Sequence, residues 1–218
     1  MATLDDLVEE VLSHQFSATQ YTTYAQQKLN EGQAYICAQT DFRELESTTD
    51  LTLVSGTASY ALPTDYSRLR TINRIETDST AEALRSMEKP AFDLLVPSDG
   101  EPTRFLIQGS TVKVWPTPDA SGTVRLNYFA TPITLVSGEV APNTPQIPAQ
   151  YTYIMVHWAL KHCYERENDY NSAVYHKGEF EAGIMKCRGE VQYDTNDRSQ
   201  PRVVGDGGPA IVIDPQVF

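Results

Sequence analysis

Positive charge is scarce in this sequence: 17 lysine and arginine residues stand against 29 aspartate and glutamate residues, and the formal net charge is -12. A protein that grips nucleic acid neutralises its phosphates with a basic face. The composition therefore excludes nucleic-acid binding by the whole surface and allows it only at a local basic patch. A repulsive surface that nucleic acid slides past is compatible with this charge.

Cysteine is scarce as well. The three cysteines, Cys37, Cys163 and Cys187, are odd in number and form no C-x-x-C pair. Each falls in a segment with helical periodicity and apolar neighbours, which predicts reduced, buried thiols. Such thiols indicate a reducing compartment.

Long apolar runs are missing. The N-terminal segment MATLDDLVEE has neither the basic nor the apolar region of a secretory signal. No stretch approaches the length of about 20 apolar residues that spans a bilayer. We therefore expect a soluble protein that is made in the cytoplasm and has no membrane partner.

Catalytic motifs are absent too. No G-x-S-x-G elbow occurs, and the glycine-rich run at 205–208 lacks the lysine of a phosphate loop and is followed by Pro209. Asp65, Asp119 and Asp169 have no spacing that pairs them, and the first two sit in turn-forming segments. The sequence predicts no catalytic residue and no cofactor.

A metal site is a weak alternative, raised by four residues near the end of the chain: His157, His162, Cys163 and His176. Two ligands on one helix share a face at a spacing of three or four residues. His157 and His162 are five apart, and His176 would come from the neighbouring helix. We expect isolated, half-buried histidines and no metal.

Helical periodicity marks the two ends of the chain. Apolar residues recur at helical spacing in 3–14, behind a cap at Thr3, and in 17–42, where Ser17 and Gln20 form a candidate capping box. Gly32 in the second stripe predicts a close helix crossing. A third helix starts at Pro148, and a last one, capped by Asp169 or Asn171, fades near Val191.

Between these helices the period becomes alternating. We expect a short helix at 89–96 and strands at 51–54, 58–62, 68–76, 104–116 (a hairpin turning at Gly109 and Ser110) and 123–130. Residues 131–147 form a long connection. Helices of these lengths cannot bury their stripes alone, so the N-terminal pair needs the C-terminal pair.

This order predicts an α+β fold: a helical bundle from the N- and C-terminal helices, with an inserted antiparallel β domain and an extended C-terminal tail. The predicted boundaries assign 1–46 to the N-terminal half of the helical bundle, 47–146 to the inserted β domain, 147–190 to the C-terminal half of the bundle and 191–218 to an extended C-terminal arm.

Two groups of residues are candidates for contacting partners. Arg68, Arg70 and Arg74 share one face of a predicted strand and could touch DNA or an acidic partner, although a solvated face that protects a sheet edge is favoured. In the tail, the β-prone run Ile211–Val212–Ile213 follows a glycine-rich hinge, and Val217 and Phe218 end the chain. Such a run can add as a strand to another subunit's sheet, fold back on its own domain, or stay disordered.

The order of several short motifs resembles the head–tail adaptor (connector) proteins of tailed bacteriophages. The motifs begin with the run Tyr60–Ala61–Leu62–Pro63–Thr64–Asp65–Tyr66 and continue at Gly100–Glu101–Pro102, Phe105–Leu106–Ile107, Gly109, Val112, Val114–Trp115–Pro116, Pro118–Asp119, Val124, Leu126, Tyr128, Pro132, Ile147–Pro148 and Tyr151. The resemblance covers roughly residues 50 to 190 and has no single specific motif.

The resemblance implies a non-catalytic virion protein at the head–tail interface. Its members form a ring, usually of twelve copies, beneath the portal protein, extend the DNA channel and dock the tail or nozzle proteins. DNA passes through without specific binding. A C-terminal extension often grips the portal, which would give the arm at 191–218 a partner.

Two other interpretations stay open from the sequence. One is a different virion component, such as a tail or baseplate protein with a β-rich binding insert. The other is a small hydrolase, which would need paired carboxylates or a histidine cluster in a pocket.

Overall fold

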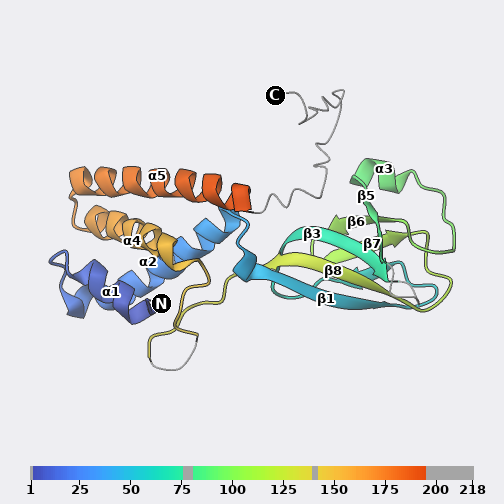
Figure 1. Cartoon of the computed structure of the whole chain (residues 1–218), viewed down its shortest axis with the longest axis horizontal. Coiled ribbons are helices and arrows are strands. Elements are labelled where there is room, and N and C mark those ends of the chain that lie inside the picture. Colours follow the sequence, from blue (N-terminus) through green and yellow to red (C-terminus); the bar gives the residue numbers. More distant parts are fainter. Residues whose placement is uncertain (1, 76–80, 139–141, 195–218) are drawn as a thin grey trace, which may run out of the picture.

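The computed structural model describes residues 2–75, 81–138 and 142–194. Figure 1 shows an elongated molecule with a bundle of helices at one end and the β-strands at the other. This arrangement confirms the predicted α+β fold class. The predicted arm residues Ile211, Val212, Ile213, Val217 and Phe218 lie outside the described residues.

The helical end is a four-helix bundle built from both ends of the chain. Its helices are α1 (Leu4–Leu12), α2 (Ala18–Gln39), α4 (Thr152–Arg166, after the short 3-10 helix η2, Ala149–Tyr151) and α5 (Tyr170–Asp194). Their apolar stripes form one continuous core. The pairing of N-terminal with C-terminal helices therefore follows from the need of each stripe for a partner.

The helix ends confirm two predicted caps and correct a third. Thr3 and Asp6 form a reciprocal capping box at α1, and the Asp169 carboxylate accepts a hydrogen bond from the backbone N–H of Ser172 at the start of α5 (3.2 Å). The capping box predicted for Ser17 is wrong, because the Ser17 side chain makes no capping hydrogen bond. Two boundaries also move: α2 ends at Gln39 rather than at 42, and α5 continues to Asp194.

Two glycines let the helices cross closely. A methyl group at Gly32 would lie 3.0 Å from Cδ1 of Trp158 in α4, which confirms the predicted close crossing. A methyl group at Gly183 of α5 would lie 2.9 Å from Cγ1 of Ile154, also in α4. Since α4 packs closely against α2 at Gly32 and against α5 at Gly183, it lies at the centre of the bundle.

The β end is a sandwich of two four-stranded sheets. The first has the order β1 (Glu46–Leu53, which follows the 3-10 helix η1, Arg43–Leu45), β8 (Gly122–Ala130), β3 (Tyr66–Ile75) and β4 (Ala81–Ala83). The second has the order β2 (Ser59–Ala61), β7 (Thr111–Trp115), β6 (Arg104–Gln108) and β5 (Arg85–Ser86), and α3 (Lys89–Asp93) follows β5. The prediction of an antiparallel domain needs one correction, because β5 pairs with β6 in parallel.

The sandwich has its own core, separate from that of the bundle. Alternate residues of β1, β3 and β8 face the second sheet, and the buried set is Leu53, Leu62, Ile72, Leu84, Phe105, Val112, Val114, Val124, Leu126 and Tyr128. The strand β1 begins five residues before the predicted start at Leu51, in the polar run Glu46–Ser47–Thr48–Thr49–Asp50. This run has no apolar alternation, so the strand was missed there.

The two cores meet at the end of β8. Tyr128 points into the sandwich, whereas the next residue, Phe129, belongs to the bundle core. The connection after β8 runs back along α2, where Asn30 and Gln33 hold it by hydrogen bonds to backbone groups of Leu135 and Ile133. The insert is thus fixed to the bundle by packing and by side-chain amides.

Candidate assembly surfaces

The three arginines of β3 do not share a face. The register of β3 against β8 shifts between Leu69 and Thr71, so the alternation of side chains is reset within the strand. Arg68 stands opposite Phe129 on the outer side of the sheet, whereas Arg74 stands opposite the buried Val124. The predicted arrangement of Arg68, Arg70 and Arg74 on one face is therefore wrong.

Arg68 and Arg70 are bound within the molecule. Arg68 forms an ion pair with Asp41 in the linker after α2, and its guanidinium lies 5.3 Å from the centre of the Phe129 ring. Arg70 forms an ion pair with Glu46 at the start of β1. Both charges are locally neutralised at the junction of bundle and sandwich, which favours a structural role over a basic patch for DNA.

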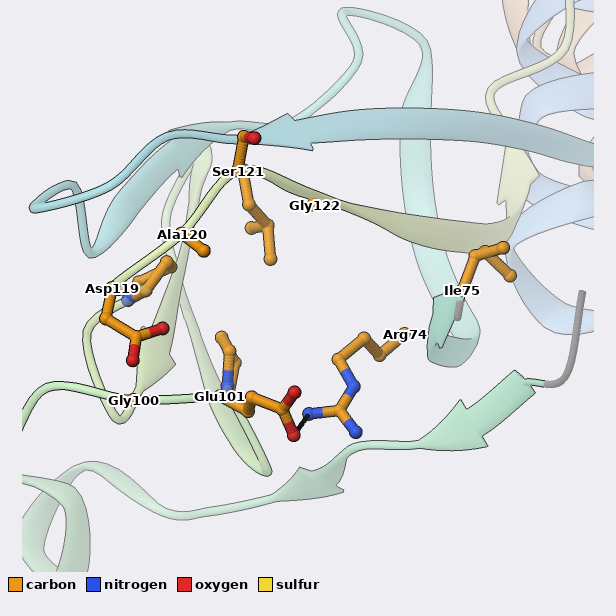
Figure 2. A pocket seen from close by; sticks show the side chains of 11 residues that line it. Arg74, Ile75, Gly100, Glu101, Asp119, Ala120, Ser121 and Gly122 are labelled. Atoms are coloured by element: carbon orange, nitrogen blue, oxygen red, sulfur yellow. Dashed lines mark hydrogen bonds and ion pairs between the residues drawn. The ribbon is translucent and has the colours of Figure 1, made fainter. Parts of the chain in front are cut away.

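Arg74 lies at a small pocket at the far end of the sandwich, shown in Figure 2. Its guanidinium donates hydrogen bonds to the carboxylates of Glu101 (2.8 Å) and Glu82 (2.9 Å), and its side chain is only 13% exposed. The pocket volume is about 180 Å³. Pockets for drug-sized ligands usually measure about 300–1,000 Å³, so this one is smaller than a usual ligand site.

The outer face of the first sheet is polar and slightly hollow. Thr48 donates a hydrogen bond to the Asn127 side chain (2.9 Å), which donates in turn to the hydroxyl of Thr71 (2.9 Å), so one ladder crosses β1, β8 and β3. A depression of about 550 Å³ lies over this ladder. The hydroxyls and the amide of this ladder bond one another, so the depression is a shallow polar surface whose central groups already have partners.

Three histidines come together between α4, α5 and the end of α1. Nδ1 of His157 and Nδ1 of His176 are 2.9 Å apart, and the ring of His14 stands edge-on to that of His176 at 5.7 Å between centres. The His176 ring also stacks on Tyr164. The prediction of isolated histidines is therefore wrong for His157 and His176, and no pattern in the sequence pointed to His14, which is distant along the chain.

Burial governs the charge of this cluster. It lowers the pKa of His176 to about 4, with help from the neighbouring His157 and His14, and it also lowers the pKa of His157. Both rings are thus neutral at pH 7, where one Nδ1–H donates to the other Nδ1. Among the described residues no group of three or more histidine, cysteine, aspartate or glutamate side chains could hold a metal ion.

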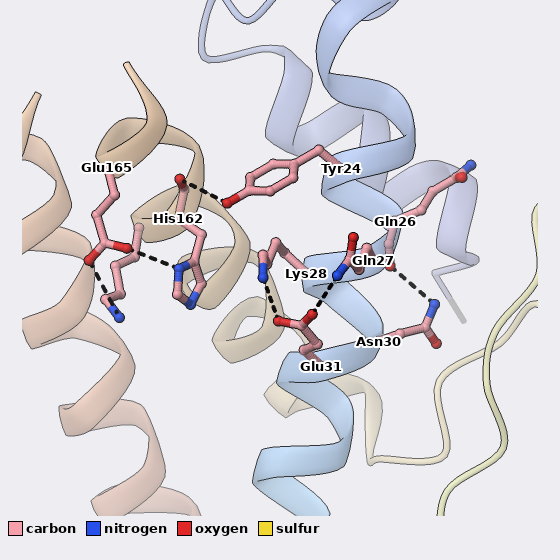
Figure 3. A network of polar contacts seen from close by, with 9 residues as sticks. Tyr24, Gln26, Gln27, Lys28, Asn30, Glu31, His162 and Glu165 are labelled. Carbon is pink, nitrogen blue, oxygen red and sulfur yellow. Dashed lines mark hydrogen bonds and ion pairs between the residues drawn. The ribbon is translucent and has the colours of Figure 1, made fainter. Parts of the chain in front are cut away.

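His162 belongs to a different set of contacts, drawn in Figure 3. Its Nδ1 lies 3.0 Å from the Glu165 carboxylate, and its backbone carbonyl accepts a bond from the Tyr24 hydroxyl of α2. Nearby on α2, Lys28 and Glu31 form a helical ion pair at 2.7 Å. These polar contacts flank the crossing of α2 and α4, which indicates a structural role for His162 and not a catalytic one.

The cysteines are structural. Cys37, Cys163 and Cys187 are free and buried, which confirms the prediction. Burial raises the pKa of Cys37 to about 12 and that of Cys163 and Cys187 to about 11. Thiols that ionise so poorly do not act as nucleophiles at neutral pH.

Exposed apolar side chains gather in three places and mark the surfaces most suited to partners. They lie on the outer side of α5, in the turn after α3 and in the connection after β8: Tyr170, Val174, Tyr175, Met185, Leu94, Val96, Ile133 and Val136. No helix within the described residues is long and apolar enough to cross a membrane.

The family comparison favours one of the open interpretations. A family model described as SU10 adaptor protein matches residues 2–205 of the 218-residue chain. The chain belongs to the SU10 adaptor protein family. A comparison with curated proteins gave no match.

Membership of the SU10 adaptor family confirms the resemblance to phage adaptors and identifies a structural adaptor protein of a bacteriophage virion. A structural family indicates a non-catalytic role. The geometry agrees with it, because the arginine, histidine and cysteine side chains singled out in the sequence all serve internal contacts. The residues available for contacts with partners are therefore those on the outer faces of the helices and sheets.

Proposed function

We propose that this adaptor forms a ring beneath the portal protein of a tailed phage, extends the DNA channel and docks the tail or nozzle proteins. The observation that supports this proposal is the family membership over nearly the whole chain. A ring of about twelve copies, as the resemblance implies, uses head-to-tail contacts that close by rotation.

The division of the fold into bundle and sandwich supports this role. The two have separate cores, are joined at Phe129 and Arg68, and give each subunit two ends that can meet different partners. The exposed apolar side chains of α5 and of the turn after α3 lie on these different ends. An adaptor between portal and tail needs two such surfaces.

The charge supports passage of DNA without specific binding. The chain carries a net charge of -12, and Arg68, Arg70 and Arg74 are paired with acidic side chains. Since release of counterions from phosphates by free basic side chains drives non-specific binding, a wall of this composition holds DNA weakly.

The C-terminal arm is proposed to reach the portal. Removing residues 195–218 leaves the described helices and strands intact, so the truncated chain is expected to fold and to lose portal binding. An unchanged affinity for the portal would contradict this aspect of the proposal.

The test of the function is particle mass by light scattering, with the purified chain alone and mixed with the portal ring of its own phage. A discrete larger complex, seen as a stacked ring by electron microscopy, is the expected result. No association at any ratio would reject the adaptor–portal contact and favour a tail component.

A further inference from the structure

One sheet edge of this fold is built differently from the others. The two sheets have four edge strands, and three of them are very short: β4 and β2 have three residues each and β5 has two. Short edges are a known protection against pairing with other chains. The fourth edge, β1, has eight residues and pairs with β8 without a register shift.

The strand β1 lacks the other protections as well. Its sequence, ESTTDLTL, contains no proline and no lysine, and three of its eight residues are threonines, which favour strands. Among the described residues, β8 is its only strand partner. Its two acidic side chains are neutralised by neighbours, Asp50 by Arg125 (2.8 Å) and Glu46 by Arg70. The edge therefore offers a regular row of backbone groups without a repelling charge.

The side chains along β1 define what can pair there. Thr49 and Leu51 face the sandwich and are half-buried, so a strand added beside them would bury apolar residues placed two apart. On the outer side, Thr48 and Thr52 are short and polar and would tolerate any neighbour. The fitting segment is extended and has β-branched apolar residues at alternate positions.

The chain contains such a segment in its C-terminal arm. Ile211 and Ile213 are two residues apart with Val212 between them. The helix α5 ends next to the end of α2, where Arg188 donates a hydrogen bond to the backbone carbonyl of Gln39 (3.0 Å), and β1 starts beyond the same junction (Figure 1). Residues 195–210 separate the segment from α5, and sixteen extended residues reach up to about 55 Å. An arm of this length can reach a β1 edge within about 55 Å of the end of α5, whether that edge belongs to its own chain or to a neighbouring copy.

We propose that Ile211–Val212–Ile213 of one copy adds as a strand to the free edge of β1 in the neighbouring copy of the ring. This inference rests on the proposed function, because it needs adjacent copies. Each subunit gives one strand and accepts one, so every edge is filled only when the ring closes. Val217 and Phe218 lie beyond the strand and stay available to the portal.

The test is cross-linking between two differently tagged full-length chains, one with Thr52→Cys and the other with Val212→Cys. The three native thiols are buried and ionise poorly, so a short bis-maleimide reacts at the new cysteines. The mixed chains are assembled with the portal ring and then cross-linked. The expected product carries both tags at twice the chain mass of 24.3 kDa.

Two controls make the result specific. Ala83→Cys, on the short edge strand β4, replaces Thr52→Cys and is expected to give at least tenfold less product. Adding Ile211→Asp and Ile213→Asp to the Val212→Cys chain is expected to remove the product. A chain carrying both Thr52→Cys and Val212→Cys reports addition to its own β1, as a cross-link within one chain.

The outcomes separate this inference from the proposed function. A portal complex that forms without the two-tag product, or with cross-links only within one chain, overturns the strand exchange and leaves the ring in place. If no portal complex forms, the proposed function fails. The strand exchange is then tested by cross-linking the concentrated chain without the portal. Absence of the two-tag product in that experiment overturns the strand exchange as well.

Discussion

Acidification is expected to destabilise the bundle through the histidine cluster. His176 is 6% exposed, and its pKa falls from the ordinary 6.5 to about 4 in the folded state. The unfolded chain therefore binds more protons than the folded chain between these two values, so stability is full above pH 6.5 and is lost as the pH falls towards 4. Each unit of difference corresponds to about 1.4 kcal/mol, which gives a loss of about 3 kcal/mol once both states are protonated.

Most of this loss can be measured before carboxylates interfere. Between about pH 7.5 and pH 5, the two pKa values predict a loss of about 2 kcal/mol in the free energy of unfolding. The charged groups that face the cluster are Glu10 and Glu179, which favour protonation of His157, and His14, which opposes it. The carboxylates with lowered pKa, such as Asp5 and Asp169, titrate below this window.

The assay is urea unfolding at several pH values for the wild type and two variants. His176→Gln removes the titrating ring, and its free energy of unfolding should change with pH by only a fraction of the wild-type amount. His162→Gln, on the same helix as His157 but bonded to Glu165, is the matched control. Burial lowers the pKa of His162 as well, but by less than that of His176, so this variant should lose a smaller share of the pH dependence than His176→Gln. Equal pH dependence in the wild type and His176→Gln would refute the reasoning.

Three further predictions concern packing and reactivity. Gly178→Ala, at a position with open space, should raise the stability of α5 by about 1 kcal/mol, whereas Gly183→Ala should lower it because its methyl group would meet Ile154; thermal melts that rank the two alike would contradict this. Gln33→Leu should cost about 2 kcal/mol, since it removes two part-buried hydrogen bonds to the backbone of the connection, at Ile133 and Gln146, and denaturant unfolding checks this against the exposed Gln27→Leu. The three thiols should resist Ellman's reagent at pH 8 until the chain is unfolded, and fast labelling of the native protein would show that they are accessible.

The helical half of the fold could be predicted because its signals are local. The stripes of α1, α2, α4 and α5 repeat at helical spacing, and Thr3 and Asp169 sit where caps belong. The failures at helix ends have the same origin. A serine before a helix, such as Ser17, satisfies the capping pattern whether or not its side chain turns towards the backbone.

The candidate surfaces could be predicted less well, because they depend on contacts distant in sequence. A bulge near Arg70 reverses the side-chain alternation of β3. The run Arg68–Leu69–Arg70–Thr71 contains no sequence signal that predicts this bulge. The meeting of His14 with His176 depends on how α1 turns into α2. The start of β1 at Glu46 was missed because polar edge strands have no hydrophobic alternation.

The end of β8 shows why the insert does not move freely on the bundle. In a strand, Tyr128 and Phe129 must point to opposite faces, and here the two faces are covered by different cores. A rotation of the sandwich would pull Phe129 out of the bundle and separate Arg68 from both Phe129 and Asp41. The Tyr128 hydroxyl adds a bond to Asp65 (2.9 Å), and the backbone of Asp65 holds Thr131 at the start of the return connection. The sandwich is therefore held to the bundle by core packing, an ion pair and hydrogen bonds together, and not by the chain connections alone.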